Sequence, residues 1–156
     1  MKRTSSALLI IILAIITSSC AKEPLKQAGL QGEHTYAVIR DLNSAYERRD
    51  LDAFMEQVGP AYPERDGFRK DVENVFLTYQ TIKQKIYTNR MQITVQEKGN
   101  IKAVYTWEGE WQTQGGKIVK DGARSTLTID KSSYKLIGID GKNPYLVTET
   151  PVPARQ

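Results

Sequence analysis

Residues 103–111, with the sequence Ala-Val-Tyr-Thr-Trp-Glu-Gly-Glu-Trp, decide the fold class of this chain. Every second residue of this stretch is aromatic or small, namely Ala103, Tyr105, Trp107, Gly109 and Trp111. A period of two is typical of a β-strand with one buried face, because successive side chains of a strand point to opposite sides. The pattern therefore predicts a long strand whose aromatic side chains face the core, with Glu108 and Glu110 on the opposite face.

The same alternation occurs on both sides of this strand. Shorter alternating segments occupy residues 91–95, 124–129 and 135–139. Gly99-Asn100 and Gly115-Gly116 lie between the segments and are typical of turns, because glycine and asparagine tolerate the backbone conformations that tight turns require. Short connections between consecutive strands predict an antiparallel sheet.

Upstream of about residue 82 the spacing is helical instead. Apolar residues recur at steps of three and four, which places them on one face of a helix. The pattern predicts helices over residues 36–46 and 51–58, the second of them capped by Asp50, and a third helix after Pro63 whose apolar stripe runs over residues 68–79. Helices followed by antiparallel strands predict an α+β domain, in which the N-terminal helices pack on a strongly curved sheet.

The first twenty residues have the composition of a cleavable export signal. A basic start precedes an unbroken apolar run over residues 7–16, and three small residues then precede Cys20. A helix of that length spans about 15 Å, half the thickness of the hydrocarbon core of a bilayer. The run therefore indicates a signal peptide, residues 1–19, rather than a permanent transmembrane helix.

This leader resembles that of bacterial lipoproteins, in which the cysteine after the cut receives lipid on its sulfur and on its new amino terminus. The resemblance implies lipidation of Cys20 and attachment to the membrane through that lipid. Thr17 stands where such signals usually have leucine, and an ordinary secreted protein with a free thiol is the alternative. Ala21, in place of an aspartate, implies by the same resemblance an outer-membrane location facing the periplasm, in a cell with two membranes.

Four segments follow from these patterns. The signal peptide is followed by a lipid anchor and flexible tether, residues 20–33, which is polar and contains one proline and two glycines. Residues 34–146 form the folded domain. Residues 147–156 contain two prolines and no apolar periodicity, which predicts a loose C-terminal tail.

Composition excludes several classes of function. One cysteine and one histidine allow neither an internal disulfide nor a metal site rich in cysteine or histidine, and no cofactor is expected. The formal net charge of +4 falls to +2 when Lys2 and Arg3 leave with the signal peptide. Because the lysines and arginines form no dense stripe, nucleic-acid binding is not expected.

Two regions carry a resemblance to a known superfamily. One is the helical stretch over residues 45–54, and the other is the pair of closing strands over residues 122–129 and 134–140. Together they resemble the cone-shaped, cystatin-like superfamily named after nuclear transport factor two, which includes ketosteroid isomerase. The resemblance would cover residues 34–146. It implies a pocket between sheet and helices, and often dimers formed across the outer sheet face, but no particular reaction.

The residues do not assemble a catalytic set. Isomerase chemistry of this superfamily needs an acidic residue on the inward face beside tyrosines, and Glu108 and Glu110 are predicted to face outward. His34 precedes the first helix and is interpreted as structural. Asp121-Gly122 and Asp140-Gly141 are interpreted as turns. No catalytic residue and no metal ligand are therefore assigned.

The aromatic row is the best candidate for binding. Tyr105, Trp107 and Trp111, with Tyr46 and Tyr62 from the helical region, could stack against an apolar ligand. The alternative is that these side chains fill the core. The sequence favours a non-catalytic envelope domain that binds a small apolar ligand or an envelope protein. A small lyase or isomerase, and a subunit that dimerises through the outer sheet face, are the other hypotheses.

Overall fold

The computed structural model describes residues 23–96 and 99–147. The predicted signal peptide, the predicted lipid site at Cys20 and residues 148–156 of the predicted tail lie outside these residues. The chain divides into two units between Gln31 and Gly32, and the second unit contains the folded domain. No helix among the described residues is long and apolar enough to span a bilayer.

The helices of the described chain are α1 (Glu23–Glu47), α2 (Leu51–Glu56) and α3 (Arg65–Thr78). The start of α1 corrects the prediction of a flexible tether over residues 20–33, because residues 23–33 are helical. Lysine, glutamine, alanine, leucine and glutamate dominate this stretch and favour a helix, and their preference outweighs the cost of its two glycines, about 1 kcal/mol each.

The predicted cap of the second helix is confirmed. The carboxylate of Asp50 accepts a hydrogen bond from the backbone N–H of Ala53 at 3.0 Å. This bond satisfies one of the amide groups that the first turn of a helix leaves without a partner. The cap fixes the point at which the chain turns from α1 into α2.

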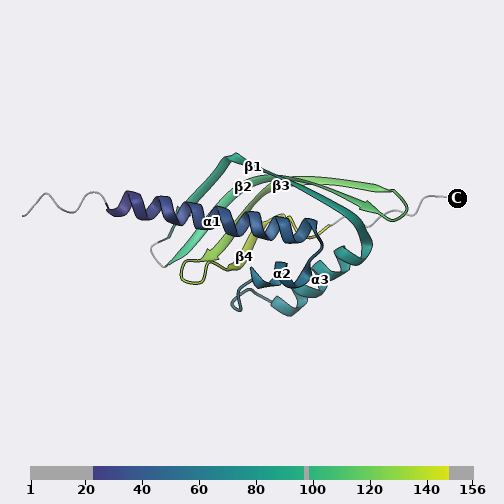
Figure 1. The fold of residues 1–156 in the computed structure, drawn as a ribbon, viewed down its shortest axis with the longest axis horizontal. Helices are drawn as coiled ribbons and strands as arrows, with labels where there is room; N and C mark the ends of the chain where they lie inside the picture. The colour runs from purple at the N-terminus through teal and green to yellow at the C-terminus, as the bar shows by residue number, and fades with distance from the viewer. Residues whose placement is uncertain (1–22, 97–98, 148–156) are drawn as a thin grey trace, which may run out of the picture. The chain divides into compact units, whose positions relative to one another are not determined.

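The strands are β1 (Tyr79–Val95), β2 (Asn100–Thr113), β3 (Ile118–Asp130) and β4 (Leu136–Gly141). They form one antiparallel sheet in the order β1-β2-β3-β4 (Figure 1). The sheet follows the helices, which confirms the predicted α+β class with helices before an antiparallel sheet. β1 bends where its register with β2 shifts, between Tyr87 and Gln92 (Figure 1).

The first strand is much longer than the sequence pattern predicted. The predicted helix over residues 68–79 ends at Thr78, and residues 79–90 are strand, whereas the first strand was expected only at residues 91–95. β1 is an edge strand, so most of its side chains meet solvent and its polar sequence lacks a clear alternation. Ile82 is buried and fits both the helical spacing and the alternation of a strand, so it does not mark where the helix ends.

The core lies between the sheet and the helices. On β2 the predicted inward row is confirmed, because Tyr105, Trp107 and Trp111 are each 0% exposed while Glu108 is exposed. The predicted buried face of α1 is confirmed except at Tyr36, which is 44% exposed.

Candidate functional site

Hydrogen bonds link the aromatic side chains of the core. The indole N–H of Trp111 donates to the hydroxyl of Tyr46 at 3.0 Å, and this hydroxyl donates to the backbone carbonyl of Tyr145, also at 3.0 Å. The indole N–H of Trp107 donates to the hydroxyl of Ser125 at 2.8 Å. Each indole therefore satisfies its single donor inside the protein, which buried tryptophans generally require.

Burial keeps the tyrosines of this region protonated. It raises the pKa of Tyr46, Tyr105 and Tyr145 well above the ordinary tyrosine value, because the anion would have to form in a poorly solvated interior. Burial also raises the pKa of Tyr62 to about 12, opposed by a hydrogen bond with Asn143. At neutral pH these phenols serve as hydrogen-bonding groups and not as bases.

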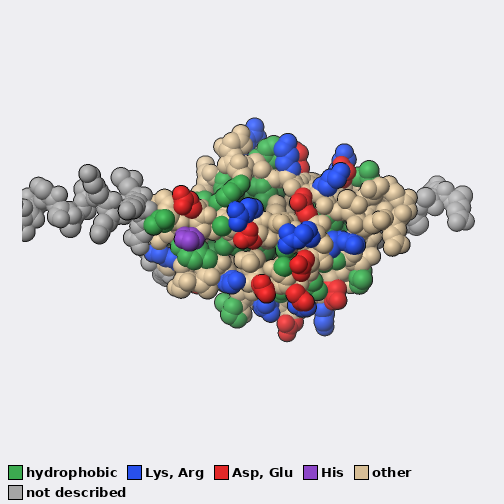
Figure 2. Space-filling view, viewed as in Figure 1, with side chains coloured by type: hydrophobic (Ala, Val, Ile, Leu, Met, Phe, Trp, Pro, Cys, Tyr) green, Lys and Arg blue, Asp and Glu red, His purple; other side chains and the backbone are tan. Residues whose placement is uncertain are grey.

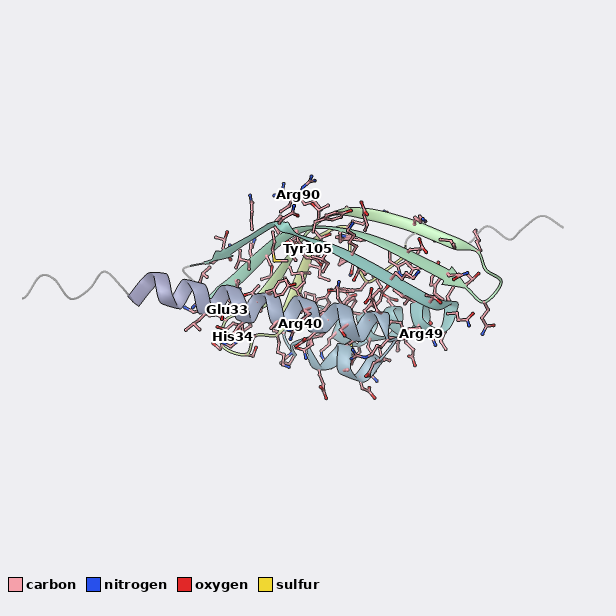
Figure 3. The ribbon with its side chains drawn as sticks, turned by 45° about the horizontal axis from the view of Figure 1, so that its top comes forward. Glu33, His34, Arg40, Arg49, Arg90 and Tyr105 are labelled. Atoms are coloured by element: carbon pink, nitrogen blue, oxygen red, sulfur yellow. The ribbon has the colours of Figure 1, made fainter. Side chains whose placement is uncertain are left out.

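The structure brings four of the five predicted ligand-binding residues together. Tyr46, Tyr105, Trp107 and Trp111 are all 0% exposed and contribute to one core cluster. Figure 3 shows Tyr105 beneath the sheet, on the side that carries α1. Tyr62 is only partly buried, and its ring stacks on that of Phe68 with the centroids 4.6 Å apart. A ligand-binding role for these residues stays a prediction.

A hollow of about 930 Å³ lies at the middle of the sheet. It is lined by Glu47 at the end of α1 and by residues 83–85, 106–110 and 120–123 of three adjacent strands, and is called the strand hollow below. Its volume is in the upper part of the range of small-molecule sites, about 300–1,000 Å³. Trp107 borders the hollow although its side chain is fully buried.

Charged side chains of both signs line the strand hollow. The register places Glu110 of β2 between Lys83 of β1 and Lys120 of β3. Lys120 lies 3.0 Å from the Glu110 carboxylate, and their hydrogen bond and opposite charges lower the pKa of Glu110. Lysines, arginines and acidic residues are also interspersed on the face seen in Figure 2. The site therefore presents paired charges and not a field of one sign.

An acidic residue on the core-facing side of the sheet borders the hollow as well. Asp121 was interpreted as part of a turn, and this was wrong, because it lies inside β3 opposite Gly109. Its side chain is 14% exposed, and the ammonium group of Lys142 donates to it at 2.6 Å. Gln84 of β1 lies on the other side of Gly109, so the glycine separates two polar side chains.

The local sequence gives little indication that Asp121 lies inside a strand. Asp-Gly is a common turn pair, and only the pairing of β2 with β3 over their whole length shows that the chain continues as strand. The signal that could have found Asp121 is its even spacing from Ser125, Leu127 and Ile129, which alternate to the same side.

The arrangement supports binding more directly than catalysis. The Asp121 carboxylate is already occupied by a lysine. His34 is exposed and packs against the ring of Tyr134, with centroids 4.8 Å apart, and it does not line the hollow. Within residues 23–96 and 99–147, no group of three or more histidine, cysteine, aspartate or glutamate residues could hold a metal ion.

Helices packed on one face of a bent antiparallel sheet define the class of protein as an α+β domain. The sequence matches no family profile and no curated protein. Solved structures are similar at the level of fold. An NTF2-like (nuclear transport factor 2) superfamily protein from Salmonella enterica is 13% identical with a TM-score of 0.60, and the match covers 80% of this chain and 99% of that chain.

Two further structures agree with this assignment. A protein with a cystatin-like fold from Caulobacter vibrioides is 18% identical with a TM-score of 0.58, covering 73% of this chain and 91% of that chain. A proposed aromatic ring hydroxylase from Novosphingobium aromaticivorans is 13% identical with a TM-score of 0.60, covering 67% and 82%. The domain therefore has the NTF2-like fold. Identities this low establish the fold alone.

Proposed function

We propose that this chain is a lipid-anchored protein of the cell envelope whose NTF2-like domain binds a small ligand and catalyses no reaction. The observation that carries the proposal is the strand hollow, which has the size of a ligand site and is lined by charges of both signs. A molecule that carries a positive and a negative group, such as an amino acid or a short peptide, matches this lining.

Charged side chains of neighbouring strands in the hollow supply the contacts expected for such a ligand. Lys85 of β1 pairs in register with Glu108 of β2, and Gly122 of β3 follows on the other side. Because Gly122 has no side chain, Glu108 has no cross-strand cation from β3, in contrast to Glu110. A ligand ammonium can therefore approach Glu108 while its carboxylate approaches Lys85.

A binding screen with zwitterionic probes tests this proposal. Amino acids and dipeptides are added to the purified protein, and binding is followed by ligand-observed NMR and by the fluorescence of Trp107, which borders the hollow. We expect Lys85→Gln and Glu108→Gln to weaken binding about tenfold each. Lys102→Gln, on the same strand as Glu108 but outside the hollow, is the matched control. Binding that none of these substitutions changes would place the ligand elsewhere.

The lipid anchor is tested separately. Metabolic labelling with palmitate should mark the wild-type chain and leave Cys20→Ala unlabelled, and the variant should leave the membrane fraction. Label on the variant, or none on the wild type, would contradict the anchor. Neither result affects the binding proposal, because the hollow is formed by residues 47–123 of the folded domain.

A small lyase or isomerase is the second candidate, and the position of Asp121 favours it. This carboxylate lies on the core-facing side of β3 and is mostly buried, which is where an acid or base of the superfamily would be needed. Asp121→Asn would then abolish turnover of a substrate while leaving its binding in place. A variant that retains full turnover would remove this candidate.

A homodimer through the outer sheet face is the third candidate. The uncharged side chains of Val104, Thr106 and Thr126 are partly exposed on this face of neighbouring strands. Light scattering during size-exclusion chromatography should then report twice the monomer mass, and Thr106→Lys should return it to the monomer value. A monomer at high concentration would contradict this candidate.

A further inference from the structure

A groove between α1 and β1, called the edge groove below, follows the free edge of the sheet. Its volume is about 220 Å³, and it is lined by α1 between Tyr36 and Glu47 and by Gln84, Ile86 and Thr88 of β1. The side chain of Tyr36 is 44% exposed. The edge groove therefore presents an aromatic ring that the described chain leaves partly uncovered.

The backbone of β1 offers hydrogen-bonding groups to this groove. The N–H of Gln84 points away from β2, because it donates to the carboxylate of Glu47 at 2.6 Å. Since the backbone groups of a strand alternate between its two edges, the N–H and C=O of Ile86 point to the groove as well. Within residues 23–96 and 99–147, the Ile86 N–H has no hydrogen-bond acceptor. An open strand edge of this kind is a template for a further strand.

The chain returns to the edge groove after β4. The side-chain amide of Gln84 donates to the Pro144 carbonyl at 2.6 Å, and the Tyr145 hydroxyl donates to the side-chain oxygen of Asn43 at 3.4 Å. Gln84 and Asn43 both line the groove. Val147, the last described residue, is three positions after Pro144 and so lies within about 10 Å of it. Nine residues follow and can span about 30 Å, more than the roughly 13 Å of β1 that borders the groove.

The sequence of residues 148–156, Thr-Glu-Thr-Pro-Val-Pro-Ala-Arg-Gln, suits a strand that pairs along one edge. Pro151 and Pro153 have no N–H group and are two positions apart, so in a strand both face the same edge. Thr150, Val152 and Ala154 keep their N–H groups and face the opposite edge. Prolines are tolerated in a sheet where their missing N–H would face solvent, which is the outer side of an edge strand.

We propose that residues 148–156 fold back and add a strand to β1 in the edge groove of the same chain. The new strand runs parallel to β1, because the segment starts at the Gln84 end of the groove. In a parallel pair the N–H of Val152 bonds a carbonyl of the β1 edge, and the two prolines turn toward α1 and the exposed Tyr36 ring, a contact that proline-containing segments often make. The added strand keeps the edge of β1 from pairing with other chains. The inference does not depend on ligand binding in the strand hollow.

Amide exchange measured by NMR on the full chain in detergent tests this docking. The Ile86 amide should exchange at least about tenfold more slowly in the wild type than in Val152→Pro, because tenfold protection corresponds to a segment docked about nine-tenths of the time. Glu149→Pro is the matched control, since it adds a proline with the spacing of the two existing ones and should keep the protection. The Lys85 amide, which faces β2, should exchange equally in all three chains.

Three results would overturn the proposal. The first is equal exchange of the Ile86 amide in the wild type and in Val152→Pro. The second is loss of protection in Glu149→Pro, because strand pairing distinguishes alternate positions. The third is protection that increases with protein concentration, which would assign the groove to the C-terminal segment of a second copy.

The contact with Tyr36 gives a second test. Nuclear Overhauser cross-peaks should join the Tyr36 ring to Pro151 or Pro153 in the wild type. Tyr36→Ser should speed exchange of the Ile86 amide at least about threefold. Leu77→Ser, which removes another exposed apolar side chain on α3 outside the groove, should leave the rate unchanged. Absence of these cross-peaks, or an equal effect of the two substitutions, would refute the docking position.

Discussion

Substitution of Gly109 by alanine should destabilise the domain by displacing Trp111. A Cβ atom at position 109 would lie 2.2 Å from Cη2 of the Trp111 indole and 2.6 Å from Cζ3. Ordinary carbon contacts require about 3.5–4.0 Å, so the ring has to move by about 1.5 Å. Trp111 is 0% exposed and surrounded by core, which leaves little space for that movement.

The magnitude follows from three effects. Overpacking of a core costs about 1–3 kcal/mol. Movement of the indole also breaks its hydrogen bond to Tyr46, which contributes about 1 kcal/mol. Replacement of glycine by alanine within a strand returns about 0.5 kcal/mol through the lower entropy of the unfolded chain. We therefore expect Gly109→Ala to lower the free energy of unfolding by about 1.5–3.5 kcal/mol.

Urea denaturation, followed by circular dichroism, measures this change. Gly115→Ala is the control, because its nearest neighbour is 3.9 Å away, and it should change stability by less than about 0.5 kcal/mol. A double-mutant cycle with Trp111→Phe then tests the cause, since the smaller ring leaves room for the new Cβ. The double variant should be at least about 1 kcal/mol more stable than additivity predicts. An additive cycle, or a neutral Gly109→Ala, would refute the reasoning.

Three further predictions concern a helix cap, a partly buried phenol and a buried ion pair. Asp50→Ala removes a helix cap and should cost about 1 kcal/mol in urea denaturation, whereas Asp52→Ala removes only an exposed ion pair and should cost less than about 0.5 kcal/mol. Because burial raises the pKa of Tyr62 to about 12, the folded chain keeps this proton to higher pH than the unfolded chain, so the free energy of unfolding should fall as pH rises from 10 to 12. Tyr62→Phe should make that fall shallower, and an unchanged slope would contradict this cause. Lys142→Met leaves the mostly buried Asp121 carboxylate without its cation, and should raise hydrogen exchange in residues 142–147, which follow β4, about fivefold while β2 stays unchanged.

The elements with strong periodicity could be predicted from the sequence. β2 alternates over its whole length because one face meets the helices and the other does not. Asp50 could be predicted as a cap because the cap depends on a local hydrogen bond. Most of β1 could not be predicted as strand, because an edge strand has solvent on several sides and its polar residues show no clear alternation.

The candidate site depended on contacts that local pattern does not specify. Asp121 and Gln84 reach opposite sides of Gly109 through the register of three strands. Tyr145 was close to the predicted end of the domain, in a segment without periodicity, and nothing in its neighbours indicates a fully buried side chain. Such residues are positioned by packing between distant parts of the chain.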